Sequence, residues 1–343
     1  MMNPLSADLD HILNHLREPL NELRGERIFL TGGTGFFGCW LLESLLWANQ
    51  KLNLGVQAAV LTRNPDAFIK KVPHLALDEN VTLLRGDVCD FAFPDGEYGY
   101  VIHAATEASA QLNQNDPSRM FDTIVEGTRR TVNFASTHGT KKFLLTSSGA
   151  VYGKQPPELS HIPEDYAGAP DPLTPLSAYG EGKRAAELLC TMAAQNCGVE
   201  MKIARCFAFV GPYLPLDIHF AIGNFIRDAL AGGPIVIKGD GTACRSYLYA
   251  ADLVIWLWTI LLQGKNCRAY NVGSDKVVTI AELAQLIAKD NPVDLEVKIQ
   301  KRSLPGVLPE RYIPSIERAK TELKLSEYIE LKTAIQNTEK WFA

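Results

Sequence analysis

Glu-Arg-Ile-Phe-Leu-Thr-Gly-Gly-Thr-Gly-Phe-Phe-Gly, residues 26–38, is a short β-rich run that leads into a glycine turn. The apolar stretch 40–46 follows, so this part of the chain predicts a strand, a tight turn and a helix. Glycines at every third position let the backbone approach a pyrophosphate, and the N-terminus of the following helix favours its charge. The turn therefore predicts a dinucleotide site formed by Gly32, Gly35, Phe36, Phe37 and Gly38.

Outward from this turn, β-rich runs alternate with helical stretches. Further strands are expected at residues 57–61, 81–84, 100–103, 142–146 and 201–206, and long helices at 117–137 and 178–196. Strands that alternate with helices indicate an α/β fold with a doubly wound parallel sheet, similar to a Rossmann fold, whose crossovers are right-handed.

The lengths of the expected strands and helices change along the chain, and this change predicts the domains. Residues 1–25 are expected to form an amphipathic N-terminal helix, and residues 26–206 the Rossmann-like dinucleotide-binding domain. Residues 207–343, with shorter strands and helices, are expected to be mainly a smaller α/β substrate-binding domain over the carboxyl edge of the sheet, although about 248–262 return to the first domain. The proline-rich stretch 155–175 is expected to be a loop.

The composition excludes several classes of protein. Of the 343 residues 46% are hydrophobic and 21% charged, with a net charge of −5, which excludes disordered and collagen-like chains and argues against a nucleic-acid partner. The longest apolar run, 253–262, is shorter than the roughly 20 residues that span a bilayer, so no membrane partner is expected. The seven cysteines show no C-x-x-C pair, no metal-like spacing and no preceding secretion signal, which favours reduced thiols in a cytoplasmic protein without a metal.

The end of the second strand bears on the choice of cofactor. An acidic residue at this position would accept the ribose 2′-hydroxyl of NAD, but the chain has Thr62 and Arg63. An arginine can clamp a 2′-phosphate, so the pair favours NADP over NAD, whereas the structural alternative is a solvated arginine. Asp87, with Val88 beside it, follows the third strand and is predicted to accept from the adenine amino group; the alternative is a turn aspartate.

Three side chains predict proton transfer. Tyr179 and Lys183 are four residues apart in the helix 178–196, so both side chains lie on one face. A nearby ammonium lowers the pKa of a phenol, and such a tyrosine can take a proton from a carbinol as hydride leaves. Ser148 ends the fifth strand, where its hydroxyl is expected to hydrogen-bond the reacting oxygen; the alternative is turn chemistry.

Together, the glycine turn and these side chains resemble the extended short-chain dehydrogenase/reductases, specifically the NAD-dependent epimerase/dehydratase family, which acts on nucleotide sugars. The resemblance covers roughly residues 26–320. Further matching segments are His103-Ala104-Ala105, Gly127-Thr128, Gly239-Asp240-Gly241-Thr242-Ala243-Cys244-Arg245-Ser246-Tyr247, Tyr270-Asn271-Val272-Gly273 and Arg311-Tyr312 with Ser315-Ile316-Glu317-Arg318-Ala319.

The resemblance implies roles for several of these residues. Ser148, Tyr179 and Lys183 are implied to be catalytic, and Ala104 and Ala105 to lie beside the cofactor. Arg245 is implied to grip the diphosphate of a nucleotide-diphosphate sugar, with Asn271 and Arg311 near the same site. The family also implies a homodimer in which the helices 117–137 and 178–196 of two subunits form a four-helix bundle.

The chain departs from the family pattern in ways that limit the reaction. Dehydratases of the family carry an Asp-Glu pair where this chain has Gly149 and Ala150, which cannot donate or accept protons through their side chains. Glu107, after the fourth strand, is a carboxylate that can reach the substrate from another direction, or simply a solvated loop residue. Other departures are Ile124, Ala208 and Ser246, where asparagine, asparagine and aspartate are usual.

These observations leave three hypotheses for the function. The first is an NAD(P)-dependent nucleotide-sugar epimerase or ketoreductase in which hydride transfer occurs at a sugar hydroxyl or ketone, at C4, with Tyr179 as acid and base. The second is a 4,6-dehydratase or decarboxylase that uses unfamiliar acid and base groups, of which Glu107 is the candidate. The third is a dinucleotide-binding sensor without turnover, against which the intact set Ser148, Tyr179 and Lys183 argues.

Overall fold

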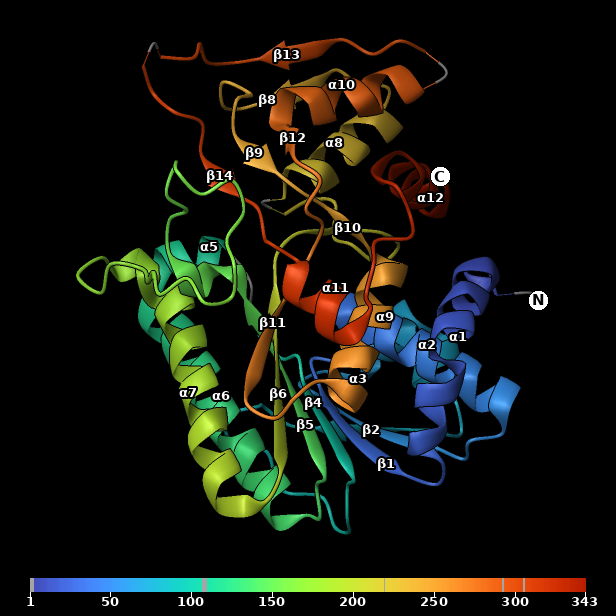
Figure 1. The fold of residues 1–343 in the computed structure, drawn as a ribbon. Coiled ribbons are helices and arrows are strands. Elements are labelled where there is room, and N and C mark those ends of the chain that lie inside the picture. The colour runs from blue at the N-terminus through green and yellow to red at the C-terminus, as the bar shows by residue number, and fades with distance from the viewer. Residues whose placement is uncertain (1–2, 107–109, 219, 292, 305) are drawn as a thin grey trace.

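A parallel sheet of seven strands forms the lower half of the protein as seen in Figure 1. The computed structural model describes residues 3–106, 110–218, 220–291, 293–304 and 306–343. In spatial order the strands are β11 (Arg268–Val272), β6 (Glu200–Cys206), β5 (Lys142–Ser148), β4 (Tyr100–His103), β1 (Arg27–Thr31), β2 (Gln57–Thr62) and β3 (Val81–Arg85). Every neighbouring pair is parallel, so the predicted doubly wound sheet is confirmed.

Helices cover both faces of this sheet. One face packs against α6 (Pro117–Thr137) and α7 (Ala178–Cys197), which lie side by side in Figure 1. The other face packs against α2 (Phe36–Leu52) and α9 (Ala250–Gln263), with α1 (Ser6–Leu20) against both of these helices. Successive residues of β1 alternate between the two cores, since Ile28 and Leu30 belong to one apolar cluster and Phe29 to the other.

A smaller group of elements lies over the carboxyl edge of the sheet, at the top of Figure 1. Its strands form short pairs and a three-stranded sheet in the order β12-β9-β14. The elements are β7 (Phe209–Val210), α8 (Ala221–Leu230), β8 (Ile235–Ile237), β9 (Cys244–Arg245), β10 (Leu248–Tyr249), β12 (Val278–Thr279), α10 (Ile280–Asp290), β13 (Val297–Ile299), β14 (Arg311–Tyr312) and α12 (Leu331–Phe342). Helix α11 (Glu317–Leu323) packs against β11 and α9. The remaining helices are α3 (Pro65–Lys71), α4 (Pro73–Ala76) and α5 (Ala110–Asn115).

One strand of the large sheet comes from the part of the chain that was expected to be mainly the second domain. Strand β11 lies within residues 207–343, yet it pairs along its whole length with β6 and completes the large sheet. A short strand carries no sequence signal for its partner, so its place in the sheet was missed. Among the described residues, no helix has the length and apolar character that a bilayer crossing needs.

The glycine turn between β1 and α2 depends on two close backbone contacts. Gly32 has φ +74°, and a Cβ there would lie 2.5 Å from the backbone of Ala104 after β4. At Gly38, in the first turn of α2, a Cβ would lie 2.3 Å from the backbone of Gly33. Only glycine permits the helix to begin this close to the end of the strand, so these residues fix the geometry of the turn.

We predict that Gly38→Ala destabilises the protein by about 1–3 kcal/mol, because the added methyl overpacks a contact between two backbone segments. Urea unfolding measures the free energy of unfolding. Gly239→Ala is the matched control, since a Cβ at Gly239 meets no atom within 4 Å. Equal unfolding curves for the two variants would contradict this account of the turn.

Candidate active site

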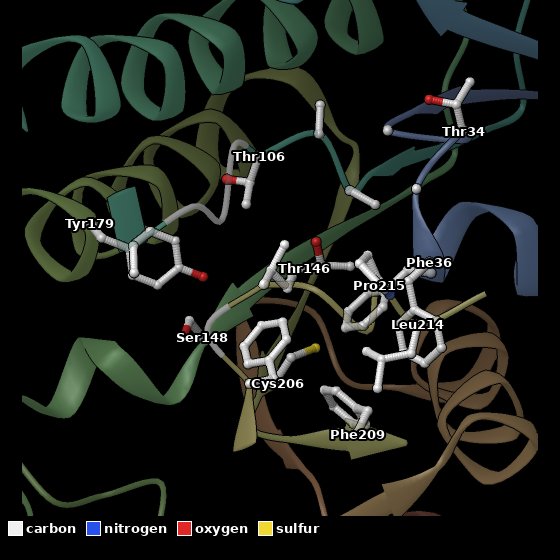
Figure 2. A pocket seen from close by; sticks show the side chains of 18 of the residues that line it. Thr34, Phe36, Thr106, Thr146, Ser148, Tyr179, Cys206, Phe209, Leu214 and Pro215 are labelled. Atoms are coloured by element: carbon white, nitrogen blue, oxygen red, sulfur yellow. The ribbon is translucent and has the colours of Figure 1, made fainter. Parts of the chain in front are cut away.

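One cavity of about 1130 Å³ opens at the carboxyl edge of the sheet. Its walls come from the ends of β1, β2, β4, β5 and β6, from α7, and from the smaller group of elements (Figure 2). In a doubly wound sheet this edge is where ligands bind, because the loops diverge where the strand order reverses. Here the order reverses between β1 and β4, directly at the glycine turn.

The dinucleotide side of the cavity collects most of the predicted cofactor residues. The lining includes Gly32, Gly35, Phe36, Phe37, Arg63, Asp87, Val88, Ala104 and Ala105. Gly38 does not line the cavity but packs against Gly33, so its role is to shape the turn. Two lining residues, Thr106 and Asn113, have buried oxygens, Oγ1 and Oδ1, without a hydrogen-bond partner in the described part of the chain. An extended polar ligand such as a dinucleotide fits this wall, since it would satisfy such atoms.

A buried histidine supports the cofactor wall. The ring of His103 lies between the hydroxyls of Thr31, 2.7 Å from Nδ1, and Thr128, 3.0 Å from Nε2. Burial lowers the pKa of His103 to about 3, with a smaller contribution from the charge of Lys183. His103 is therefore neutral, and its role is to hold Thr31 Oγ1, which in turn accepts from the Ala105 N–H at 3.2 Å.

The proposed catalytic side chains meet inside the same cavity. Tyr179 and Lys183 come from the first turns of α7, and Ser148 from the end of β5. In Figure 2 the hydroxyl of Tyr179 points into the cavity, on the side where Ser148 lies. Burial raises the pKa of Tyr179, whereas a hydrogen bond with the Ser148 side chain acts in the opposite direction. The serine is thus the neighbour that favours ionisation of this phenol.

Lys183 is a buried cation on the same helix as Tyr179. Its Nζ donates to the Thr146 carbonyl oxygen at 2.9 Å and lies 6.0 Å from the centre of the Tyr179 ring. Burial lowers the pKa of Lys183 to about 8. The two side chains line the cavity from the same helix, as expected, and burial has the largest effect on the pKa of Tyr179 and raises it.

The structure places two further residues that were expected to hold the substrate, Arg245 and Arg311, differently. Arg245 lines the cavity, where one guanidinium nitrogen donates to Glu310 at 2.7 Å. Arg311 lies on β14 and is not among the lining residues, although its neighbour Tyr312 is. Glu107 lies outside the described residues.

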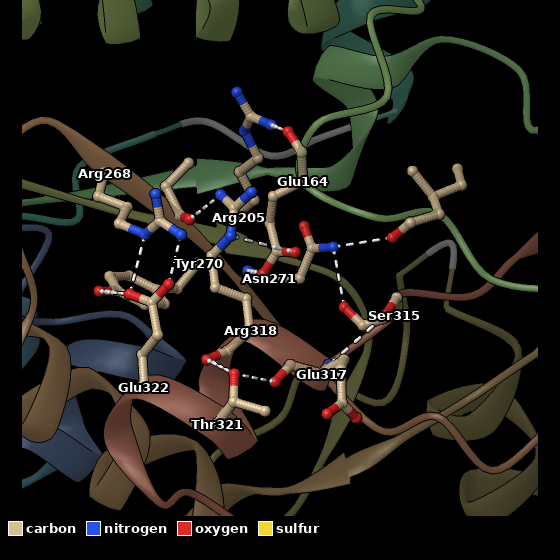
Figure 3. Close-up of polar contacts among 12 residues, drawn as sticks. Glu164, Arg205, Arg268, Tyr270, Asn271, Ser315, Glu317, Arg318, Thr321 and Glu322 are labelled. Atoms are coloured by element: carbon tan, nitrogen blue, oxygen red, sulfur yellow. Dashed lines mark hydrogen bonds and ion pairs between the residues drawn. The ribbon is translucent and has the colours of Figure 1, made fainter.

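Asn271 is a structural residue, which corrects its expected place at the substrate. It is fully buried, and its Nδ2 donates to the carbonyl oxygens of Ile162 at 2.9 Å and Ser315 at 3.0 Å (Figure 3). Its Oδ1 accepts from the Tyr152 hydroxyl at 2.7 Å, and its backbone N–H donates to Glu164 at 2.9 Å. With its polar groups engaged by the protein, Asn271 ties β11 to two loops rather than binding a ligand.

The sequence did not predict the apolar and phenolic wall that residues beyond 206 contribute to the cavity. Phe207 and Tyr312 face each other with ring centres 4.6 Å apart, and both line the cavity. The other apolar residues of this wall include Ala208, Phe209, Leu214, Pro215, Ile218 and Ile222. The only available signal was the position of Tyr312 next to Arg311 in a segment that matched the family pattern. No cluster of three metal-binding side chains occurs among the described residues.

Comparisons with known proteins agree on one family. The sequence profile described as the NAD dependent epimerase/dehydratase family matches residues 28–273. UDP-glucuronic acid decarboxylase 6 of Arabidopsis thaliana is 31% identical over 316 residues, which cover 92% of this chain and 88% of the relative. An epimerase structure from Methanothermobacter thermautotrophicus has a TM-score of 0.79 at 23% identity and covers 96% of both chains. The UDP-glucuronic acid 4-epimerase of Bacillus cereus has a TM-score of 0.77 at 23% identity, over 92% of this chain and 98% of that one.

Proposed function

The chain belongs to the NAD dependent epimerase/dehydratase family, and from this premise we propose that it transfers hydride at a hydroxyl or ketone, at C4, of a nucleotide-diphosphate sugar. The observation that carries the proposal is the meeting of Tyr179, Ser148 and Lys183 in the cavity that the glycine turn lines. When bound, the nicotinamide ring accepts or returns the hydride. As hydride leaves the carbon, Tyr179 takes the proton of the hydroxyl, and it gives the proton back when the ketone is reduced.

Ser148 acts on Tyr179 in this exchange, and Lys183 acts on the reacting oxygen. Ser148 hydrogen-bonds with the phenol and favours its ionised form. Lys183, held by the Thr146 carbonyl, has a pKa of about 8 and so keeps a positive charge below that pH, next to the cavity that receives the substrate. That charge favours electron density that develops on the reacting oxygen.

We propose that Arg245 holds the diphosphate of the substrate. Its guanidinium is partly exposed, and the carboxylate it now meets, Glu310, is 60% exposed and can yield to a ligand. An arginine matches phosphate oxygens in a bidentate arrangement. Relatives named for UDP-glucuronic acid support a nucleoside diphosphate in this position. In this proposal the two ligands are bound by different parts of the chain. Residues 26–206 and about 248–262 hold the dinucleotide, and most of 207–343 holds the sugar nucleotide.

Epimerase or ketoreductase chemistry fits the site better than dehydration. Gly149 and Ala150, next to Ser148, contribute no carboxylate to the cavity. General acid–base help is worth about 10²–10⁴-fold per group, so a dehydratase or decarboxylase would need another donor. Relatives are decarboxylases, so release of carbon dioxide from UDP-glucuronic acid is the alternative to be measured.

We predict that the protein loaded with dinucleotide changes its nicotinamide absorbance with at least one nucleotide sugar, and that Tyr179→Phe lowers kcat about 10²–10⁴-fold, as expected for loss of an acid–base group. Dinucleotide binding should remain. Tyr100→Phe is the control, because Tyr100 is buried outside the cavity and its hydroxyl donates to Glu22 at 2.8 Å. Chromatography coupled to mass spectrometry separates the products: an epimer has the mass of the substrate and differs in retention, whereas a reduced sugar, a 4-keto-6-deoxy sugar and a pentose differ in mass. Unchanged turnover in Tyr179→Phe would refute the proposal.

We propose NADP as the preferred cofactor. Arg63 is exposed at the dinucleotide end of the cavity, and no carboxylate stands at Leu61 or Thr62 to repel a 2′-phosphate. Arg63→Ala should weaken NADP binding about tenfold, the loss of roughly 1.4 kcal/mol, and leave NAD binding unchanged. Calorimetry gives both dissociation constants. Lys70→Ala is the control, since Lys70 is an exposed cation on the nearby helix α3 and does not line the cavity. Tighter NAD than NADP binding, with Arg63→Ala altering neither, would contradict this preference.

We propose a homodimer through α6 and α7. The two helices pack together and expose apolar side chains: Phe121 on α6, and Leu188 and Met192 one turn apart on α7. An interface there would bury this patch in a two-fold arrangement. Sedimentation velocity should give a dimer for the wild type and a monomer for Leu188→Glu with Met192→Glu, while Leu77→Glu, at another exposed leucine, should remain a dimer. A monomeric wild type, or a dimeric double variant, would refute this interface.

The cysteines bear on the location of the protein. All seven are free thiols, and four of them, Cys39, Cys190, Cys206 and Cys244, are buried. Burial raises the pKa of the Cys206 thiol, which lines the cavity, to about 12. Such thiols behave as apolar packing groups, which supports our proposal of a reducing, cytoplasmic environment. Thiol titration of the protein purified under argon from its own cells should find seven free thiols, and a disulfide there would contradict the proposal.

A further inference from the structure

At Gly149, the first of the two positions where the family's dehydratases carry an acid, the aromatic side chains of Phe207 and Tyr312 fill the space. A Cβ on Gly149 would lie 2.7 Å from two ring atoms of Phe207 and 2.7 Å from the hydroxyl oxygen of Tyr312. Side chains do not pack this closely, and neither ring has a flexible end that could move aside. Position 149 therefore has no room for a carboxylate, whereas a phenol hydroxyl from another part of the chain occupies that place.

Tyr312 is firmly fixed in this position. Its strand, β14, pairs with β9 next to Arg245, so the ring enters the cavity from the smaller group of elements. On its C-terminal side, the Ile313 N–H donates to Gln155 at 2.9 Å and the Ile313 carbonyl accepts from Ile162 at 2.9 Å. Asn271 binds the Ser315 carbonyl in the same segment, as Figure 3 shows. These bonds define where the hydroxyl lies.

The hydrogen bonds of Ser148 show what the Tyr312 hydroxyl can do. Ser148 Oγ accepts from the Ala150 N–H at 3.1 Å, and the Ser148 side chain lowers the pKa of both neighbouring phenols, Tyr179 and Tyr312. A serine hydroxyl has one proton and two acceptor sites. Burial holds the pKa of Tyr312 well above its usual value, so this phenol keeps its proton and has it to donate. A bond from Tyr312 into the second acceptor site leaves the Ser148 proton for the oxygen of Tyr179 or of the substrate.

We propose that Tyr312 is a positioning residue, which donates to Ser148 Oγ and thereby aims the Ser148 proton at the reacting oxygen. With Phe207 it also closes the space above Gly149, so that no side chain there can act on the substrate. This inference rests on the proposed hydride transfer. It explains why no acid or base at position 149 can lead the reaction on to dehydration. Ser148 and Tyr179 are the groups that touch the reacting atoms, and Tyr312 acts through Ser148.

Tyr312→Phe tests the positioning role, because it keeps the ring and removes only the hydroxyl. We expect kcat for sugar oxidation to fall about threefold to tenfold, the loss of one hydrogen bond, with KM nearly unchanged. The ascending limb of the pH–rate profile should move to higher pH by about half a unit, because Ser148 then stabilises the Tyr179 phenolate less well. Tyr98→Phe is the control: Tyr98 is buried outside the cavity and accepts from Arg27 at 2.7 Å. An unchanged kcat and pH profile in Tyr312→Phe would overturn the proposal.

A second measurement does not depend on turnover. Ultraviolet difference titration of the dinucleotide-loaded protein follows the tyrosine that ionises at the lowest pH. That midpoint should rise in Tyr312→Phe and stay constant in Tyr98→Phe, and an unchanged midpoint in Tyr312→Phe overturns the proposal. A wild type without turnover on any nucleotide sugar would refute the proposed function, whereas this titration would still decide the role of Tyr312.

The steric part of the inference is tested by a double-mutant cycle. Gly149→Ala should destabilise the protein, because its methyl would lie 2.7 Å from both rings. Gly149→Ala combined with Tyr312→Phe should recover part of that loss, since one of the two contacts disappears. Strictly additive losses in urea unfolding would show that the Tyr312 hydroxyl does not occupy the space above Gly149.

Discussion

The approach of the glycine turn to the end of β4 is the constraint on which the rest of the site depends. Gly32 lies so close to Ala104 that no side chain fits between them. This contact brings the ends of β1 and β4 together, and the Thr31–His103–Thr128 hydrogen bonds lock them. The cavity opens directly above, at the point where the strand order reverses. A bulkier turn would separate the dinucleotide wall from the catalytic strand β5.

Burial determines the electrostatics of the cavity. Desolvation raises the pKa of Tyr179 and lowers the pKa values of Lys183 and His103, so the neutral form of each is favoured. Hydrogen bonds stabilise the charged form of two of these groups. The Thr146 carbonyl holds the ammonium of Lys183, and Ser148 favours the phenolate of Tyr179. The pKa of Tyr179 therefore depends on Ser148 more than on the charge of Lys183.

The sequence predicted the parts of the structure that are encoded locally. The glycine turn, the alternating strands and helices, and the meeting of Ser148, Tyr179 and Lys183 follow from spacing and from the common carboxyl edge of parallel strands. It did not predict the place of β11, the structural role of Asn271 or the phenol of Tyr312. Each of these depends on contacts between residues far apart in the sequence, such as Asn271 and Ser315, whose numbers differ by 44. A motif places the segment 311–319 near the site, but only the packing decides that Tyr312 rather than Arg311 enters the cavity.

The central claim is that hydride leaves a sugar carbon while Tyr179 receives the hydroxyl proton. Rapid mixing of the protein, loaded with oxidised dinucleotide, with a nucleotide sugar that carries deuterium at C4 tests it most directly. The account predicts that nicotinamide absorbance appears in the first turnover and that deuterium slows its appearance. No absorbance change, or equal rates for the protonated and deuterated sugars when chemistry limits the first turnover, would contradict it.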